Sequence, residues 1–201
     1  MIKNQWILLF ILLLFAIITP AQAINPESLI EFERHRQSVN QTGMMVLGGW
    51  ALGNIMTGSY GHFNTTGQTR YFHQMNAMWN VVNLGIATFG YLGASGADPM
   101  GMGISEIVRE YTSFQNILLL NAGLDVAYMT AGFYLRERSK TASRPDMLMG
   151  FGNSIILQGA FLFVFDVVLF FIHRSNASVK LYPVLDMTNP DYAGFGLVIG
   201  L

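Results

Sequence analysis

The chain has 201 residues, of which 52% are hydrophobic and only 11% are charged, against about 25% charged in a typical soluble domain. So few charges cannot cover the surface of a soluble globule of this size, and the formal net charge of −1 leaves no basic surface for nucleic acid. The sequence contains no cysteine, which excludes disulfides, thiolate metal sites and cysteine nucleophiles.

Residues 1–23 have the three parts of a secretory signal peptide. Lys3 supplies the positive charge, the 13 residues from Trp6 to Ile18 form an unbroken apolar run, and Ala21-Gln22-Ala23 matches the cleavage pattern. The run is short for a spanning helix, so we interpret the segment as a cleaved leader, with an uncleaved anchor as the alternative. Under both interpretations the following residue, Ile24, emerges on the exported side.

Residues 24–173 are expected to form a domain of four spanning helices. Asn25-Pro26-Glu27 is typical of a helix start, with an amide cap, proline at the first position and an acid in the first turn. The helix that begins there runs into the first of four apolar segments. Each segment has about 19 to 26 residues, enough for a hydrocarbon core about 30 Å thick. The segments are 43–61, 71–93, 114–135 and 148–173.

The connections between these segments are short. They are a polar turn (62–70), a Gly/Pro loop (94–103) followed by a charged helical stretch (Ile104–Tyr111), and a basic loop (136–146). Short connections join antiparallel neighbours, so the predicted fold class is all-α, an integral-membrane up-down four-helix bundle. Residues 174–201 are predicted to form an exported C-terminal tail. Because apolar residues alternate with glycine near its end, we expect the tail from Leu181 to be extended or disordered.

Basic residues predict the orientation of the bundle. The loops 62–70 and 136–146 carry five basic residues in 20 positions, whereas the segments that would be exported carry five in 67. We therefore expect a multi-pass protein of the bacterial inner membrane with both termini on the periplasmic side. The five basic residues of the two loops are Arg70, Arg136, Arg138, Lys140 and Arg144.

The chain shows a weak internal repeat at an offset of 73 residues. Glu33-x-x-Arg36 falls on Glu106-x-x-Arg109, and Met56–Tyr60 falls on Met129–Phe133. We interpret the pattern as a duplicated helical hairpin whose two copies have the same orientation. Chance similarity between glycine-rich apolar helices is the alternative.

Two carboxylic acids fall inside the predicted spans. Asp125 follows Asn121 by one helical turn, and Asp166 follows Gln158 by two turns. An ionisable side chain at membrane depth costs about 2.5–3.5 kcal/mol, so it normally faces the bundle interior. The two acids differ in depth by under about 10 Å, close enough to share a cavity and handle protons or cations. The alternative is that each is a hydrogen-bonded structural group.

The second predicted span carries a polar stripe. His73, Asn76, Asn80 and Asn83 are spaced by 3, 4 and 3 residues, which places them on one helical face. Such amides hold helices together through hydrogen bonds, or they line a hydrated path or a polar headgroup pocket.

Histidine pairs raise the question of haem. His62 and His73 are expected near the cytoplasmic surface, and His35 and His173 near the exported surface. All four lie at predicted helix ends, where histidine is ordinary, and no ligand spacing on one helix supports a metal. The sequence also lacks nucleophile-elbow, zinc-protease, phosphate-loop and dinucleotide motifs. We therefore predict no cofactor and no metal.

Four stretches resemble an uncharacterised bacterial family of four-helix integral membrane proteins, a domain of unknown function. The resemblance covers roughly residues 30–175. It implies the four-helix architecture and includes both carboxylic acids, but it brings no activity or substrate. The stretches are Tyr71–Gly85, Leu120–Tyr128, Gly150–Gly152 and Leu157–Asp166.

Three functions remain open on this sequence. We favour a binding or scaffold component that recognises membrane lipid or a partner membrane protein, because no catalytic motif is visible. The first alternative is a small, oligomeric proton- or ion-coupled transporter or channel that uses Asp125 and Asp166. The second is a haem-binding or enzymatic membrane bundle.

Overall fold

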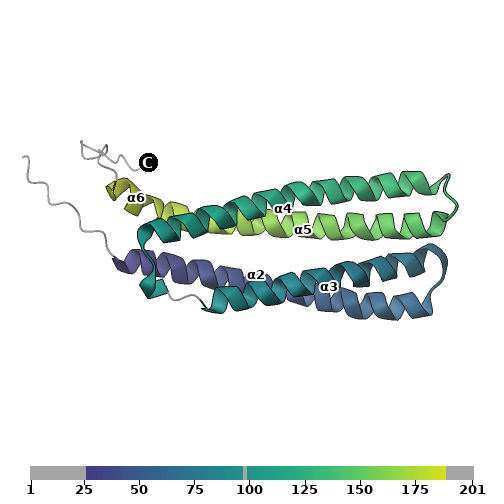
Figure 1. Cartoon of the computed structure of the whole chain (residues 1–201), viewed down its shortest axis with the longest axis horizontal. Helices are drawn as coiled ribbons and strands as arrows, with labels where there is room; N and C mark the ends of the chain where they lie inside the picture. The colour runs from purple at the N-terminus through teal and green to yellow at the C-terminus, as the bar shows by residue number, and fades with distance from the viewer. Residues whose placement is uncertain (1–25, 97–98, 189–201) are drawn as a thin grey trace, which may run out of the picture.

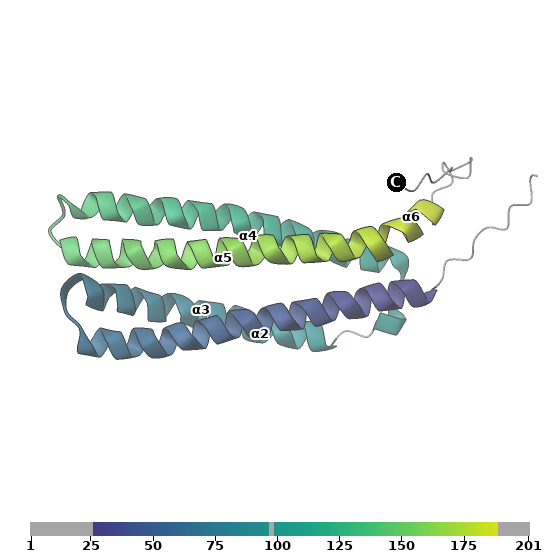
Figure 2. The ribbon, with the colours of Figure 1, turned by 180° about the vertical axis from the view of Figure 1, so that it is seen from behind.

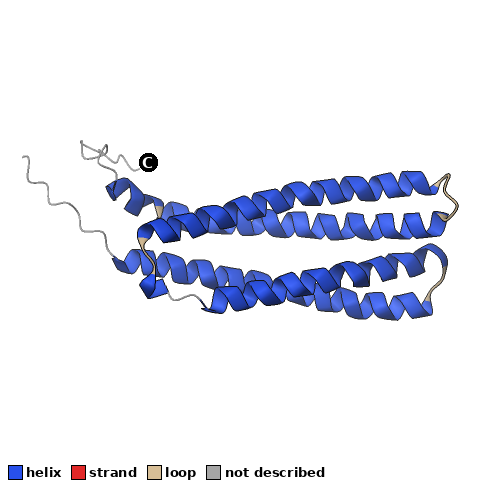
Figure 3. Cartoon of the chain, in the orientation of Figure 1, coloured by secondary structure: helices blue, strands red, loops and turns tan. Residues whose placement is uncertain are grey.

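The structure of the protein is a computed structural model that describes residues 26–96 and 99–188. This part is helical and contains no strand (Figure 3), which confirms the predicted all-α class. The predicted signal peptide and residues 189–201 lie outside the described residues. The elements are α2 (Pro26–Asn64), α3 (Gly67–Gly96), the short 3-10 helix η1 (Pro99–Gly101), α4 (Ile104–Ser139), α5 (Pro145–Lys180) and α6 (Tyr182–Thr188).

The four long helices run alternately up and down as two hairpins (Figure 1). Helix α2 packs mainly on α3, and α4 packs mainly on α5. The hairpins are joined chiefly by α3 against α5 and to a smaller extent by α2 against α5. Helix α5 therefore touches all three of the other long helices. Both tight hairpin turns lie at one end of the molecule, and η1, α6 and the start of α2 lie at the other (Figure 2).

Helices α2 and α4 begin where the sequence predicts, at Pro26 and Ile104, whereas α3 and α5 begin within the stretches predicted as connections, 62–70 and 136–146. Proline at the first position starts α2 and α5, where its missing N–H costs nothing. With 30 to 39 residues each, the long helices exceed the roughly 20 residues that a bilayer core needs. They therefore project past the predicted spans. The turn between α2 and α3 ends at Gly67, whose positive φ of 58° suits glycine.

Glycines allow the helices to approach closely at three interfaces. A Cβ on Gly58 would lie 2.8 Å from the backbone oxygen of His73 in α3, and one on Gly132 would lie 2.8 Å from that of Gly152 in α5. A Cβ on Gly150 would lie 2.7 Å from the backbone nitrogen of Phe72. Small residues of this kind are the usual means of close helix packing in membranes.

The residues after the predicted fourth span are helical, not extended. Helix α5 continues to Lys180, and α6 follows directly. The reason is a small apolar core at this end of the molecule, in which α6 covers the ends of the long helices. The prediction of an extended or disordered tail is therefore wrong for residues 182–188. The core consists of Leu29, Phe32, Ile107, Tyr111, Ala177, Leu181 and Val184.

Helices α4 and α5 are long and apolar enough to cross a membrane. Their most apolar stretches lie mainly on the outside of the structure, because only 17% of that stretch in α4 and 28% in α5 is buried. The core helix of a soluble protein would instead be mostly covered by other elements.

Candidate functional site

A cleft of about 330 Å³ lies between α3 and α4, with α2 and α5 behind it. Its walls are mostly apolar and aromatic. The rim side chains Val82 and Ile86 from α3, and Ile117 and Leu124 from α4, are exposed on the surface. The cleft is therefore open sideways, between the two helices.

Asp125 and Asp166 meet inside this cleft. Both carboxyl groups line it, both residues are buried, and their side chains lie within hydrogen-bonding reach of each other. Two ionised carboxylates within hydrogen-bonding reach repel each other, whereas a proton on one of them lets it donate a hydrogen bond to the other. In the described part of the chain, Asp125 Oδ2 is buried without a hydrogen-bond partner. The pair can therefore hold a proton or accept a donor from a ligand.

The close approach of α4 and α5 positions the carboxyl pair. A Cβ on Gly159 would lie 3.0 Å from the backbone oxygen of Asp125. Because glycine has no side chain, α4 packs closely on α5 next to Asp125. Asn121, one turn before Asp125, lines the same cleft, as does Asn83 from α3. The aromatic rings of Trp79 and Tyr128 meet edge to face at the cleft, 4.9 Å apart.

Four residues form a closed hydrogen-bonded circuit, here called the amide ring: Trp50, Asn54, Asn76 and Gln158. Trp50 Nε1 donates to Gln158 Oε1 at 2.9 Å, and Gln158 Nε2 donates to Asn76 Oδ1. Asn76 Nδ2 then donates to Asn54 Oδ1 at 2.7 Å, and Asn54 Nδ2 donates to the backbone oxygen of Trp50 at 2.8 Å. The ring therefore joins α2, α3 and α5 through hydrogen bonds.

The rest of the predicted polar stripe continues from the amide ring toward the cleft. Asn80 Nδ2 donates to the backbone oxygen of Asn76 at 2.8 Å, and Asn83 Nδ2 donates to Asn80 Oδ1 at 3.3 Å. All three asparagines are buried. Asn83 therefore belongs both to this chain of amides and to the wall of the cleft.

The structure places seven of the eight predicted site residues in two groups that share Asn83. The cleft takes Asp125, Asp166, Asn121 and Asn83, and the amides around the ring are Gln158, Asn76, Asn80 and Asn83. His73 belongs to neither, since its ring packs against the backbone of α2 at Gly61. Sequence reasoning missed Trp50 and Asn54. Their spacing of one turn within the apolar segment 43–61, where Asn54 is the one amide side chain, is the signal that points to them.

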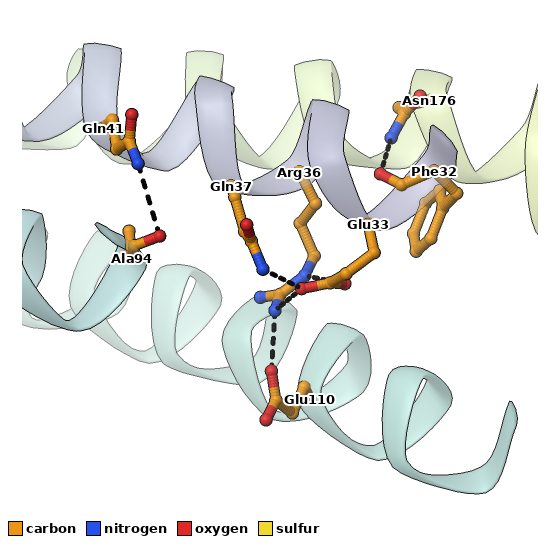
Figure 4. A network of polar contacts seen from close by, with 8 residues as sticks. All are labelled: Phe32, Glu33, Arg36, Gln37, Gln41, Ala94, Glu110 and Asn176. Atoms are coloured by element: carbon orange, nitrogen blue, oxygen red, sulfur yellow. Dashed lines mark hydrogen bonds and ion pairs between the residues drawn. The ribbon is translucent and has the colours of Figure 1, made fainter. Parts of the chain in front are cut away.

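A buried ion pair at the η1 end was noted in the sequence only as a mark of the repeat. Arg36 Nε and Nη2 donate to the two oxygens of Glu33 at 2.8 and 2.6 Å, and Nη2 also donates to Glu110 of α4 at 2.6 Å (Figure 4). Burial disfavours the charged guanidinium, but both carboxylates outweigh it and raise the pKa of Arg36 above its usual value. The matching pair of Arg109 and Glu106 is exposed, at 3.7 Å.

The histidines do not form a site of their own in the described segments. His173 is buried against the ring of Phe114, while His35 is exposed at the surface. No group of three or more His, Asp or Glu side chains within residues 26–96 and 99–188 is placed to hold a metal ion.

Comparison with known proteins gives one match. A family model described as a family of unknown function, DUF6992, matches residues 46–167. No curated protein and no solved structure matches the chain. The matched segment includes the amide ring and both acids of the cleft.

Proposed function

The chain belongs to the DUF6992 family of unknown function, and we propose that it is a multi-pass membrane protein that binds an amphiphilic ligand in the cleft between α3 and α4. The proposal has two steps, the placement of all four long helices in the membrane and the binding of a ligand beside the carboxyl pair. The observation that carries it is a buried pair of acids inside a cleft that opens sideways between apolar helices.

The outward faces of α2 and α3 support membrane placement of these helices too. The buried asparagines of α3 turn inward, so the average hydropathy of this helix understates the apolar character of its outer surface. A soluble protein rarely exposes apolar patches of this extent. The large apolar side chains exposed on the two helices include Met45, Leu52, Met56, Phe63, Val81, Val82, Ile86 and Phe89.

The basic residues support one orientation. Arg70, Arg136, Arg138, Lys140 and Arg144 all lie at or beside the two tight turns, which share one end of the molecule (Figure 1). Cytoplasmic loops carry such an excess of basic residues. We therefore place this end in the cytoplasm and the η1 end on the periplasmic side of a bacterial inner membrane.

The chemistry of the cleft defines the ligand class. Apolar and aromatic walls suit a hydrocarbon chain or ring, and a few polar groups inside such a pocket fix the orientation of the ligand. Here the polar groups are two acids and two amides, which accept hydrogen bonds from an amine or hydroxyl group. A ligand with an apolar body and such a donor can enter from the lipid without crossing water.

A tryptophan in the cleft tests this proposal. Ile86→Trp fills the opening, whereas Val81→Trp adds the same side chain to an exposed position of α3 that does not line the cleft. We expect protein purified from membranes in mild detergent to carry a bound small molecule, detected by mass spectrometry. Ile86→Trp should lose it and Val81→Trp should retain it. A wild-type protein without any bound molecule contradicts the proposal.

The carboxyl pair also favours a second function, proton-coupled transport. A pair that shares one proton changes its charge when a substrate or cation arrives. Asp125→Asn and Asp166→Asn should then abolish proton flux in liposomes loaded with a pH-sensitive dye, while the proteins remain folded. Unchanged flux in both variants, or none in the wild type, excludes this function.

A further inference from the structure

A groove of about 410 Å³ runs between α2 and α5. Val39, Gly43 and Val46 line it from α2, and Val164, Val168 and Ile172 line it from α5. Its walls carry no charged side chain. Phe165 and Leu169 line both this groove and the cleft, so the two spaces share a wall but are separate.

The two ends of the groove differ in chemistry. At the inner end Phe161 stacks on Trp50, with ring centroids 3.8 Å apart. At the outer end Ile172 also lines a second hollow, of about 510 Å³, together with His35, Ser175, Asn176 and Lys180. Lys180 Nζ lies 2.5 Å from Glu31 and keeps part of its side chain exposed. An uncharged groove thus leads to a cluster of polar side chains and to the ion pair of Lys180 and Glu31.

The dimensions match one leaflet of a bilayer. From Phe161 to Ile172, α5 rises by roughly 16 Å, about half of a hydrocarbon core 30 Å thick. Ser175 and Asn176 then fall at the depth of the head groups. Side chains of a helix lean toward its N-terminus, so the long side chain of Lys180 leans back toward this layer.

We propose that this groove binds a phospholipid, with one acyl chain between α2 and α5 and the phosphate group at Lys180 and His35. The occupant follows from the sequence of chemistries along the groove. It is apolar to mid-depth, and at the head-group level it presents hydrogen-bond donors and the partly exposed ammonium group of Lys180, which a phosphate group would share with Glu31. Basic pockets between helices bind anionic head groups in this way. The inference rests on the proposed membrane placement but not on a ligand in the cleft.

Native mass spectrometry of the purified full chain tests the site by titration with phosphatidylglycerol, with diacylglycerol as a probe that has the same chains and no phosphate. Val168→Trp blocks the groove, and Val126→Trp is its control on α4, exposed and outside every cavity described. Lys180→Gln removes the cation, and Lys140→Gln is its control, since Lys140 also pairs with a glutamate, at 2.7 Å.

We expect the wild type to bind one phosphatidylglycerol tightly and diacylglycerol weakly. Val168→Trp should weaken phosphatidylglycerol binding by roughly tenfold or more because the indole occupies the acyl-chain path. Lys180→Gln should weaken it about fivefold, and neither control should change it. Equal binding by all variants, or equal binding of both probes, overturns the inference. If no cleft ligand is found but this pattern persists, the proposed function fails and the phospholipid site stands.

Discussion

Arg36 shows how one side chain holds the two hairpins together. It bridges Glu33 on its own helix and Glu110 on α4, and Glu33 has no exposed surface. Removing one partner of a buried ion pair leaves an unpaired buried charge, which costs more than the pair itself contributes. The exposed pair of Arg109 and Glu106 has the same spacing in sequence and is a matched control.

We expect Arg36→Met to lower the free energy of unfolding by about 3–5 kcal/mol. Arg109→Met should lower it by only about 0–1 kcal/mol. Denaturation in detergent, followed by circular dichroism, measures both. Adding Glu33→Gln to Arg36→Met should restore part of the loss, since no unpaired carboxylate then remains at that position. Equal effects of the two arginine substitutions would show that burial does not matter here.

The amide ring makes a second prediction at the residue scale. Gln158→Leu keeps a similar volume but leaves Trp50 Nε1 and Asn76 Oδ1 without their partners, so we expect a loss of about 1–3 kcal/mol. Asn116→Leu, at an exposed position of α4, should stay within about 0.5 kcal/mol of the wild type. Thermal unfolding followed by tryptophan fluorescence tests this directly, because Trp50 is part of the ring. A stable Gln158→Leu would mean that the ring is not structural.

The sequence predicts which residues are polar and inward-facing but not which of them meet. Polar groups in apolar segments are costly, so Asp125, Asp166 and the asparagines of α3 stand out by composition alone. Their partners depend on helix rotation and register. Trp50 and Gln158 are 108 residues apart, and no local spacing connects them.

At the scale of elements, close packing through glycine explains how α4 and α5 lie together. A Cβ on Gly132 would lie 2.7 Å from Ile156 Cγ1 and 2.8 Å from the backbone oxygen of Gly152, whereas nothing lies within 4 Å of one on Gly123. Both glycines belong to α4, so their substitution by alanine changes helix propensity equally. Only the contact differs.

We expect Gly132→Ala to destabilise the protein by about 1–3 kcal/mol, because the α4–α5 contact must open. Gly123→Ala should be neutral or stabilising by up to about 1 kcal/mol, since alanine favours helix more than glycine does. The midpoint of thermal unfolding in detergent distinguishes them. If Gly132→Ala is as stable as Gly123→Ala, this interface is looser than the structure shows.

Element boundaries followed from the sequence where local chemistry determines them. Pro26 marks the start of α2 as predicted, and the predicted stretch from Ile104 begins α4. Pro145 starts α5, although it falls in the stretch predicted as the basic loop. The far ends were not predictable in this way. Helix α5 continues to Lys180 and α6 follows because Ala177, Leu181 and Val184 bury themselves against α2 and α4, and that contact is tertiary.

At the scale of the whole molecule, the proposed orientation predicts which positions can be labelled from outside the cell. Because the chain has no cysteine, a single introduced thiol reports on its own position. Gly101→Cys in η1 and Thr141→Cys in the α4–α5 turn both introduce an exposed thiol. In intact cells, a membrane-impermeant maleimide should label Gly101→Cys alone, and both variants should react after the cells are opened. Labelling of both in intact cells, or of Thr141→Cys alone, contradicts the proposed orientation.

The arrangement of the helices is what the sequence could not predict. Short connections imply two antiparallel hairpins, but they do not say that α5 takes the central place or that α3 and α4 stay apart. The cleft exists because α4 packs on α5 rather than on α3. This arrangement depends on the relative positions of three helices, which no single segment of the sequence determines. Asp125 and Asp166 were expected at similar depth, and the close packing of α4 on α5 at Gly159 brings their side chains together.

The central claim, a ligand held in this cleft, is tested most directly by a photoreactive amino acid in α4. Leu124 lines the cleft, whereas Leu120, one turn away, is exposed and does not. After illumination of intact membranes, we predict that the protein with the probe at Leu124 carries one defined small-molecule adduct by intact mass. The probe at Leu120 should give only a mixture of bulk lipids. The same mixture at both positions, or no adduct at Leu124, would contradict the account.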